Sequence, residues 1–417
     1  MELHVPVPFT TDRPAIAFDH TVHDVDIQNH PNAQHFPQPT EHATTQPVND
    51  TLKEFLAPAG FPKSYKDFVQ QEWPQLTLLV TSFNDATLVT VIWPHYLMDA
   101  CGHEALMHNW GRVLAGREGE VETVLGASED VLNFIDESKA KDQEPLYLEP
   151  QRMSTMQIIL FFLIFIWRKL TGPKSEARMI YLPDVTYAKL KQRTLTEAQT
   201  TAKITGQDPF VTDGDILTTW PAHAVMQANP LKPRPLNIFD IVDARRRLPG
   251  VSEAQGVYLQ NVVFLANDIY TAEEASGSPG ALALVHRREL ARQASQEQTW
   301  ANLRTIRDAL HAGKKLLPFF GSPNSRIVFS NNVAKSDFIG ITDFSPAVIC
   351  QGQKSESRKN PAGTMVSYYN CPTHKSLDMI GFCYNWGKDH NKGHWLMCNA
   401  EPKAWKLLEQ DLRSLQA

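Results

Sequence analysis

The chain has 417 residues, of which 42 % are hydrophobic and 21 % charged, and its formal net charge is −6. This composition is ordinary for a globular protein, so it excludes collagen-like, coiled-coil and wholly disordered chains. The mildly acidic balance argues against nucleic acid as a partner, because phosphate binding needs a basic surface. Five cysteines without a CxxC pair argue against a disulfide framework and predict a reducing, cytoplasmic location. The length predicts two domains, and the first residues lack the pattern of a secretory signal.

The first part of the chain predicts a loop, a β-hairpin and an amphipathic helix. Residues 20–50 are rich in His, Pro, Asn, Gln and Thr, which is typical of loops, and their histidines lack the spacing of metal ligands. Leu76–Trp93 consists of two β-rich runs broken at Asn84, as in a hairpin. Apolar residues between 106 and 114 then fall on one helical face, and Gly116 follows as a stop signal.

Ile158–Trp167 is a run of ten apolar residues. As a helix it would be about 15 Å long, too short for about 30 Å of bilayer hydrocarbon. The run favours a helix that is buried on most of its surface. The alternative is peripheral contact with an intracellular membrane, which the flanking Arg152, Arg168 and Lys169 would suit.

The rest of the chain predicts strands mixed with helices. The expected strands lie in Glu176–Asp184, Leu236–Val242, Val257–Ala266, Arg326–Phe329, Ala347–Cys350, Thr364–Tyr369 and Met379–Trp386, and the expected helices in 185–203, 210–225, 281–311 and Pro402–Leu415. This mixture predicts an α/β fold of two domains with mixed sheets, which we place at residues 1–180 and 181–417. A cleft between two such domains favours a small-molecule site.

The motifs of common enzyme classes are missing. The chain contains no GxGxxG, GxxxxGK[ST], HExxH or GxSxG pattern, so dinucleotide binding, P-loop phosphoryl transfer, zinc peptidase and standard hydrolase chemistry lose their usual marker. An HxxxD pattern occurs three times, at His20/Asp24, His95/Asp99 and His374/Asp378. Only the second stands where the predicted hairpin ends and the predicted helix begins.

His95 at this junction suits proton abstraction. An imidazole with its ordinary pKa of about 6.5 accepts a proton near neutral pH and can activate a hydroxyl or amine. Taken alone, His95 fits a buried core histidine better than a base. We expect Asp99 to be structural, either as the N-cap of the following helix or through an ion pair.

Four stretches resemble the BAHD family of acyl-CoA-dependent acyltransferases, particularly its fungal members. SFNDATLVTVIWPHYLMDACGHEALMHNWGRVLAGRE resembles the HxxxD region, and ILTTWPAHAV resembles the helix that opens the second domain. IFDIVDARRRLPG, followed by GVYLQNVV, resembles the aspartate-x-arginine stretch and the YFGN-like strand, and SDFIGITDFSPAVI resembles the DFGWG region. The resemblance runs along the whole chain in the family's order.

This resemblance implies two chloramphenicol-acetyltransferase-like domains with a channel between them. It implies acyl-CoA as co-substrate, with no tightly bound cofactor and no metal. It also implies transfer of an acyl group, for which acetyl is the first candidate, to a small, fairly apolar alcohol of secondary metabolism. His95 would be the general base, with Asp99 turned away and paired with Arg245, while Asp343 and Phe344 would be structural. The ligands of the CoA phosphates stay unassigned. Lys314, Lys315, Arg326 and Lys335 are candidates, although solvated surface is the commoner role of such residues.

The sequence also departs from the family pattern. Ala100 stands where plant members have Gly, and the DFGWG region lacks its Trp and both glycines. MELHVPVPFT resembles the second strand of the family, so we expect the opening helix and strand to be absent, which predicts an uncovered sheet edge. Either another subunit covers that edge, or the chain is a shortened form with altered or lost activity. Two alternatives therefore stay open: a silent member that binds a small ligand, and an enzyme that uses His95 for a cyclisation or isomerisation without CoA.

Overall fold

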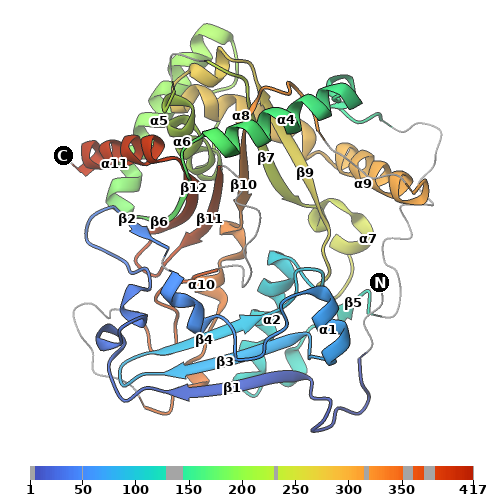
Figure 1. Ribbon diagram of the computed structural model, residues 1–417, viewed down its shortest axis with the longest axis vertical. Helices are drawn as coiled ribbons and strands as arrows, with labels where there is room; N and C mark the ends of the chain where they lie inside the picture. Colours follow the sequence, from blue (N-terminus) through green and yellow to red (C-terminus); the bar gives the residue numbers. More distant parts are fainter. Residues whose placement is uncertain are drawn as a thin grey trace.

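The computed structural model describes residues 5–48, 50–127, 144–229, 233–313, 319–350, 360–370 and 381–416. Figure 1 shows two parts: the blue N-terminal elements lie at the bottom around a small sheet, and the larger sheet lies above them. The N-terminal part contains β1 (Ile16–Val22), α1 (Tyr65–Gln71), β3 (Leu76–Ser82), β4 (Thr87–Ile92), α2 (Ala100–Leu114) and β5 (Val124–Leu125). The expected α/β architecture of two parts with mixed sheets is confirmed.

The small sheet has the strand order β1-β3-β4, with β1 parallel and β4 antiparallel to β3. Side chains along β3 alternate between buried and half-buried, as the two-residue period of a strand requires. The predicted hairpin and the helix after it are therefore confirmed. Among the described residues the first strand is β1, and residues 5–10 form none, contrary to the likeness proposed for MELHVPVPFT. β1 lies at one edge of this sheet, and its Phe18 and Val22 are exposed. The uncovered edge that the resemblance implies stays a prediction.

The large sheet has the order β2-β6-β12-β11-β10-β7-β9 and mixes parallel and antiparallel pairs. Its strands are β2 (Thr44–Pro47), β6 (Glu176–Leu182), β7 (Leu236–Asp243), β9 (Val263–Tyr270), β10 (Arg326–Asn332), β11 (Phe382–Lys388) and β12 (His394–Ala400). The other elements of this part are α4 (Thr155–Thr171), α5 (Asp184–Thr205), α6 (Asp213–Gln227), α7 (Pro249–Ser252), β8 (Val257–Tyr258), α8 (Pro279–Gln293), α9 (Gln296–His311), α10 (Phe338–Ile341) and α11 (Pro402–Gln416). Helices α5, α6, α8 and α11 share the main hydrophobic core with one face of this sheet.

The two parts are joined by several segments. β5 pairs with β8, and β2, from the first fifty residues, pairs with β6 in the large sheet. The segment after β10 returns to the N-terminal part, where Phe344 packs edge-on against Trp110 of α2 with ring centroids 5.2 Å apart. The division proposed at residues 180 and 181 falls inside β6 and stays a prediction.

Two predicted strands are wrong. Ala347 ends the short 3-10 helix Ser345–Ala347 and residues 348–350 form no strand, while residues 364–369 form no strand beyond a single bridge between Thr364 and Asp343. The apolar and aromatic residues of the second segment pack against other elements instead, as when Tyr368 stacks on Phe338 at 4.9 Å between centroids. Residues 281–311 form two helices. The Ser295 side chain accepts a hydrogen bond from the backbone N of Gln298 and so caps a second helix, which begins at Gln296.

The expectation that the apolar helix is mostly buried is also wrong. Helix α4 begins at a capping box formed by Ser154 and Gln157, yet Phe161 is its only fully buried residue. Ten consecutive apolar residues carry no period that would reveal which side chains face the core. In the described part of the chain no helix combines the length and the apolar character needed to cross a membrane.

Candidate active site

A cavity of about 2790 Å³ lies between the two parts and is lined by both. The N-terminal part contributes strand β4 and the turn after it, and the other part contributes the ends of β7, β10 and β11. His95 is among the lining residues and is exposed. The pattern His95/Asp99 therefore faces a space that a substrate can enter, unlike His20, which lies on the exposed edge strand β1 and bonds to Ser82. The pair His374/Asp378 lies outside the described residues.

The backbone that carries His95 is held from both parts. The indole Nε1 of Trp93 donates to the Met98 carbonyl at 3.1 Å and closes the turn. Asn261, from the other part, donates its Nδ2 to the carbonyl oxygen of His95 at 2.8 Å. These bonds fix the main chain at His95, which lines the cavity and is exposed.

Asp99 performs both of the structural roles expected of it. Its Oδ1 accepts from the backbone N of Gly102 at 3.0 Å, which caps α2, and from Nη2 of Arg245 at 2.8 Å. Its Oδ2 accepts from the backbone N of Val262 at 3.2 Å. The side chains of Asp99 and Arg245 are 6 % and 12 % exposed, so the predicted ion pair is present and shielded from water.

Arg245 connects several loops below the cavity. It donates to the carbonyls of Tyr258 and Gln260 at 2.9 and 2.7 Å and to the Asp243 carboxylate at 2.7 Å. Burial lowers the pKa of its guanidinium, but the carboxylates of Asp99 and Asp243 outweigh burial and raise that pKa above its ordinary value. The guanidinium is therefore charged and is not the solvated arginine that its basic run would suggest.

Two other titratable groups of α2 cannot replace His95. Burial lowers the pKa of His103 to about 4, and its ring stacks on Trp93 at 4.4 Å between centroids. Burial raises the pKa of the Cys101 thiol to about 12. Because a thiolate and not a thiol is the nucleophile, Cys101 offers no acyl-enzyme chemistry at neutral pH.

Helix α2 lies close to the other part at Gly102. A Cβ at this position would stand 2.2 Å from the carbonyl oxygen of Leu259, whereas a Cβ at Gly111 on the same helix would meet its nearest neighbour at 3.6 Å. We expect Gly102→Ala to destabilise the protein by about 1–3 kcal/mol or more, because backbone must move.

Gly111→Ala is the matched control for Gly102→Ala. It should leave stability unchanged or raise it by up to about 1 kcal/mol, since alanine favours helix. Denaturant unfolding of both variants measures the difference. Equal stabilities would show that the helix is not pressed against Leu259.

The other predicted residues divide into three groups. The structural roles of Asp343 and Phe344 stay predictions: Oδ1 of Asp343 accepts from the backbone N of Ser345 at 2.8 Å, and Phe344 packs on α2 and lines the cavity. Lys335 lines the cavity, whereas Arg326 pairs with Glu401 and is not among the lining residues. Lys314 and Lys315 lie outside the described residues.

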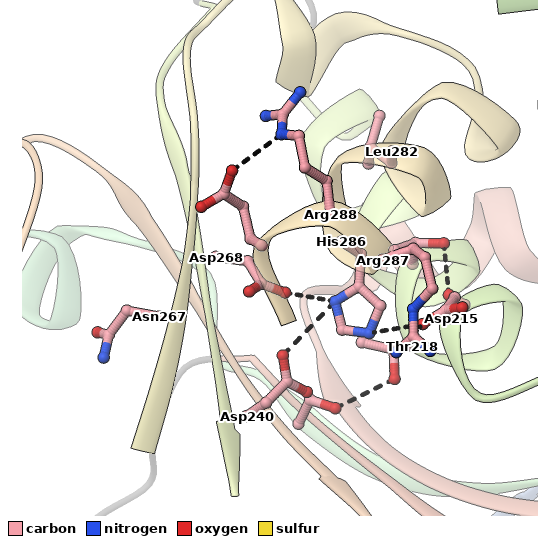
Figure 2. A network of polar contacts seen from close by, with 12 residues as sticks. Asp215, Thr218, Asp240, Asn267, Asp268, Leu282, His286, Arg287 and Arg288 are labelled. Atoms are coloured by element: carbon pink, nitrogen blue, oxygen red, sulfur yellow. Dashed lines mark hydrogen bonds and ion pairs between the residues drawn. The ribbon is translucent and has the colours of Figure 1, made fainter. Parts of the chain in front are cut away.

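Sequence reasoning missed a buried polar cluster in the cavity wall. Figure 2 shows His286 of α8 between Asp268 of β9 on one side and Asp215 of α6 on the other. Nδ1 of His286 lies in close contact with Asp268 and 3.5 Å from Oδ2 of Asp240, and its Nε2 lies 3.5 Å from Oδ1 of Asp215. The four residues come from four separate elements, so no local pattern could have indicated them.

The stretch GVYLQNVV resembles a family motif, but the sequence does not indicate that Asn261 in it bonds to the His95 carbonyl.

The cluster predicts a pH-dependent stability. Burial, with Asp268 nearby, raises the pKa of Asp240 from 3.8 to about 7. Between these values the folded protein binds more protons than the unfolded chain, so this carboxyl makes stability fall as the pH rises from about 4 to about 7. Asp240→Asn should remove that loss and raise the free energy of unfolding at pH 8 by up to about 4 kcal/mol.

Denaturant titrations at pH 5 and pH 8 measure this effect of Asp240→Asn. Asp19→Asn, on the exposed side of β1, is the control and should keep the pH dependence of the unsubstituted protein. If Asp240→Asn also keeps it, the Asp240 carboxyl is not protonated in the folded state.

Comparison with known proteins finds acetyltransferases among the relatives of this chain. No protein-family model matches the chain. It is 30 % identical over 420 residues to the acetyltransferase pyiB of Pyricularia grisea, covering 100 % of this chain and 82 % of that protein. It is 29 % identical over 426 residues to the O-acetyltransferase PaAT-2 of Phomopsis amygdali, covering 100 % of this chain and 86 % of that protein. The crystal structure of F. graminearum TRI101, complexed with coenzyme A and deoxynivalenol, matches with a TM-score of 0.57 and 16 % identity over 96 % of this chain and 80 % of that one. The likeness to TRI101, at 16 % identity, shows a shared fold.

Proposed function

Because the chain belongs to the BAHD family of acyl-CoA-dependent acyltransferases, we propose that His95 is its general base and that its acceptor is a small, fairly apolar alcohol. Acetyl is the first candidate for the acyl group, since relatives such as pyiB and PaAT-2 are acetyltransferases. The observation that carries the proposal is the exposed imidazole of His95 on a fixed turn inside the cavity between the two parts.

The proposed reaction is direct transfer. The acceptor hydroxyl gives its proton to the His95 imidazole, and its oxygen forms a bond to the thioester carbonyl carbon. The resulting oxyanion collapses, the carbon–sulfur bond breaks, and the imidazolium returns the proton to the leaving sulfur. The products are the ester and the free thiol of CoA, so atoms and charge balance without another reactant. The raised pKa of Cys101 supports direct attack over a cysteine-bound intermediate.

The cavity has the size and lining for two substrates. Its volume of about 2790 Å³ exceeds the roughly 300–1,000 Å³ of a typical small-molecule pocket. Aromatic residues that suit an apolar acceptor line it, among them Phe83, Trp93, Trp110, Phe338, Tyr368 and Trp386. Cations that suit the phosphates of CoA line it as well, among them Arg246, Lys335, Lys388 and Lys392.

The test is release of free thiol from acetyl-CoA in the presence of a panel of alcohols. We expect release that depends on the alcohol and produces its ester in equal amount. No release with acetyl-CoA or longer acyl-CoA donors would favour one of the two alternatives, a silent ligand-binding member or an enzyme of proton transfer without CoA.

A further inference from the structure

The outer face of helix α4 is an apolar stripe. Its members recur every three or four residues along the helix and are Met156, Ile159, Leu160, Leu163, Ile166, Trp167 and Leu170. Their exposed fractions run from 47 % at Leu160 to 78 % at Leu170. Apolar residues normally turn away from water on a surface helix, so a stripe that faces outward along four turns marks an interaction surface.

The opposite face of α4 accounts for its attachment to the protein. Phe161 packs against Phe319 with ring centroids 5.0 Å apart, and Arg168 donates to Asn324 at 2.6 Å. Figure 1 shows α4 in the upper part, away from the blue N-terminal elements, and none of its residues lines the cavity. The stripe is therefore separate from the active site.

The charges around the stripe favour an anionic partner. No acidic residue occurs between Glu149 and Glu176, whereas this interval holds Arg152, Arg168, Lys169 and Lys174 in a chain of net charge −6. Lys169 and Lys174 are exposed. At the same end of the helix, burial and the neighbouring cations Arg234 and Arg326 lower the pKa of Arg168 to about 10, against the opposing effect of Glu401.

The length of the stripe argues against a coiled-coil partner. From Met156 to Leu170 it spans two heptads, and stable coiled coils use at least three to four. The stripe is about 21 Å long and one helix wide, with a tryptophan and cations at one end, which are the features of a helix lying in a membrane interface.

We propose that α4 binds the surface of an anionic lipid bilayer, with its apolar stripe among the acyl chains and Lys169 and Lys174 at the headgroups. The helix lies along the interface, because a helix of 17 residues is shorter than the bilayer hydrocarbon, which is about 30 Å thick. This proposal does not depend on acyl transfer. It would place the enzyme where apolar acceptors partition.

The experiment is co-sedimentation of the full chain with vesicles of phosphatidylcholine alone and of phosphatidylcholine mixed with phosphatidylserine. We expect binding to the mixed vesicles that weakens at high salt. Leu163→Gln/Trp167→Gln should lower the partition constant about tenfold or more, since two apolar side chains leave the lipid. Val185→Gln/Ile204→Gln on α5, where both residues are more exposed than Leu163 and Trp167, is the matched control and should bind like the unsubstituted protein.

The thermal midpoint of each variant, which exposed substitutions should hardly change, shows whether it is folded. Failure of the unsubstituted protein to sediment with either vesicle would overturn the proposal. A dimer in light scattering that Leu163→Gln/Trp167→Gln dissociates would also overturn it and would assign the stripe to a second copy of this chain.

Discussion

Replacing His95 with alanine is expected to lower kcat for thiol release by about 10²–10⁴-fold, the usual contribution of a general base. The ring of His95 is exposed to the cavity, and its main chain is held by Asn261. Removing the ring should therefore leave the turn and the fold intact. We expect KM for acyl-CoA and acceptor to change little, because proton abstraction acts in the transition state.

His390→Ala is the control for a histidine in the same cavity. His390 also lines the cavity and is exposed, but it lies on the β11–β12 loop. It should keep most of the activity. Equal thiol release from the His95→Ala variant and the unsubstituted protein would remove His95 as the base. Equal loss in both histidine variants would point to a general effect on the cavity.

The junction that carries His95 could be predicted because its signals are local. The change from strand to helix periodicity and the HxxxD spacing stand within forty residues, and the structure places the hairpin, the turn and α2 there. The Asp99–Arg245 pair joins residues 146 positions apart. It was reached through family resemblance, since no periodicity relates such distant residues.

The errors arise where tertiary contacts override local pattern. Residues 364–369 have a strand-like composition, but Tyr368 and Tyr369 pack on Phe338 and Phe36 instead of joining a sheet. The exposure of α4 is decided by what the rest of the fold leaves uncovered, which an unbroken apolar run does not reveal. The cluster around His286 is assembled from α6, α8, β7 and β9 and exists only in the folded chain.

Replacing Asp99 with alanine should cause a large loss of stability. The change removes the N-cap of α2, worth about 0.5–2 kcal/mol, and leaves Arg245 without one of its two carboxylates. Breaking a buried ion pair typically costs about 3–5 kcal/mol, because a buried charge is left uncompensated. Asp243 still lies 2.7 Å from Arg245, so we expect a total loss near the lower end of that range, with a lower yield of folded protein and lower activity.

Asp99→Asn separates the two roles of Asp99. Asparagine also caps helices, so this variant should lose the ion pair and keep the cap, and it should be about 1 kcal/mol more stable than Asp99→Ala. Glu120→Ala is the control for an exposed ion pair, with Arg117, and should cost less than about 1 kcal/mol. Denaturant unfolding of the three variants, with activity per folded molecule, makes the comparison. If Asp99→Ala unfolds like Glu120→Ala, Asp99 does not hold the two parts together beneath His95, and its place in the motif requires a role in the chemistry instead.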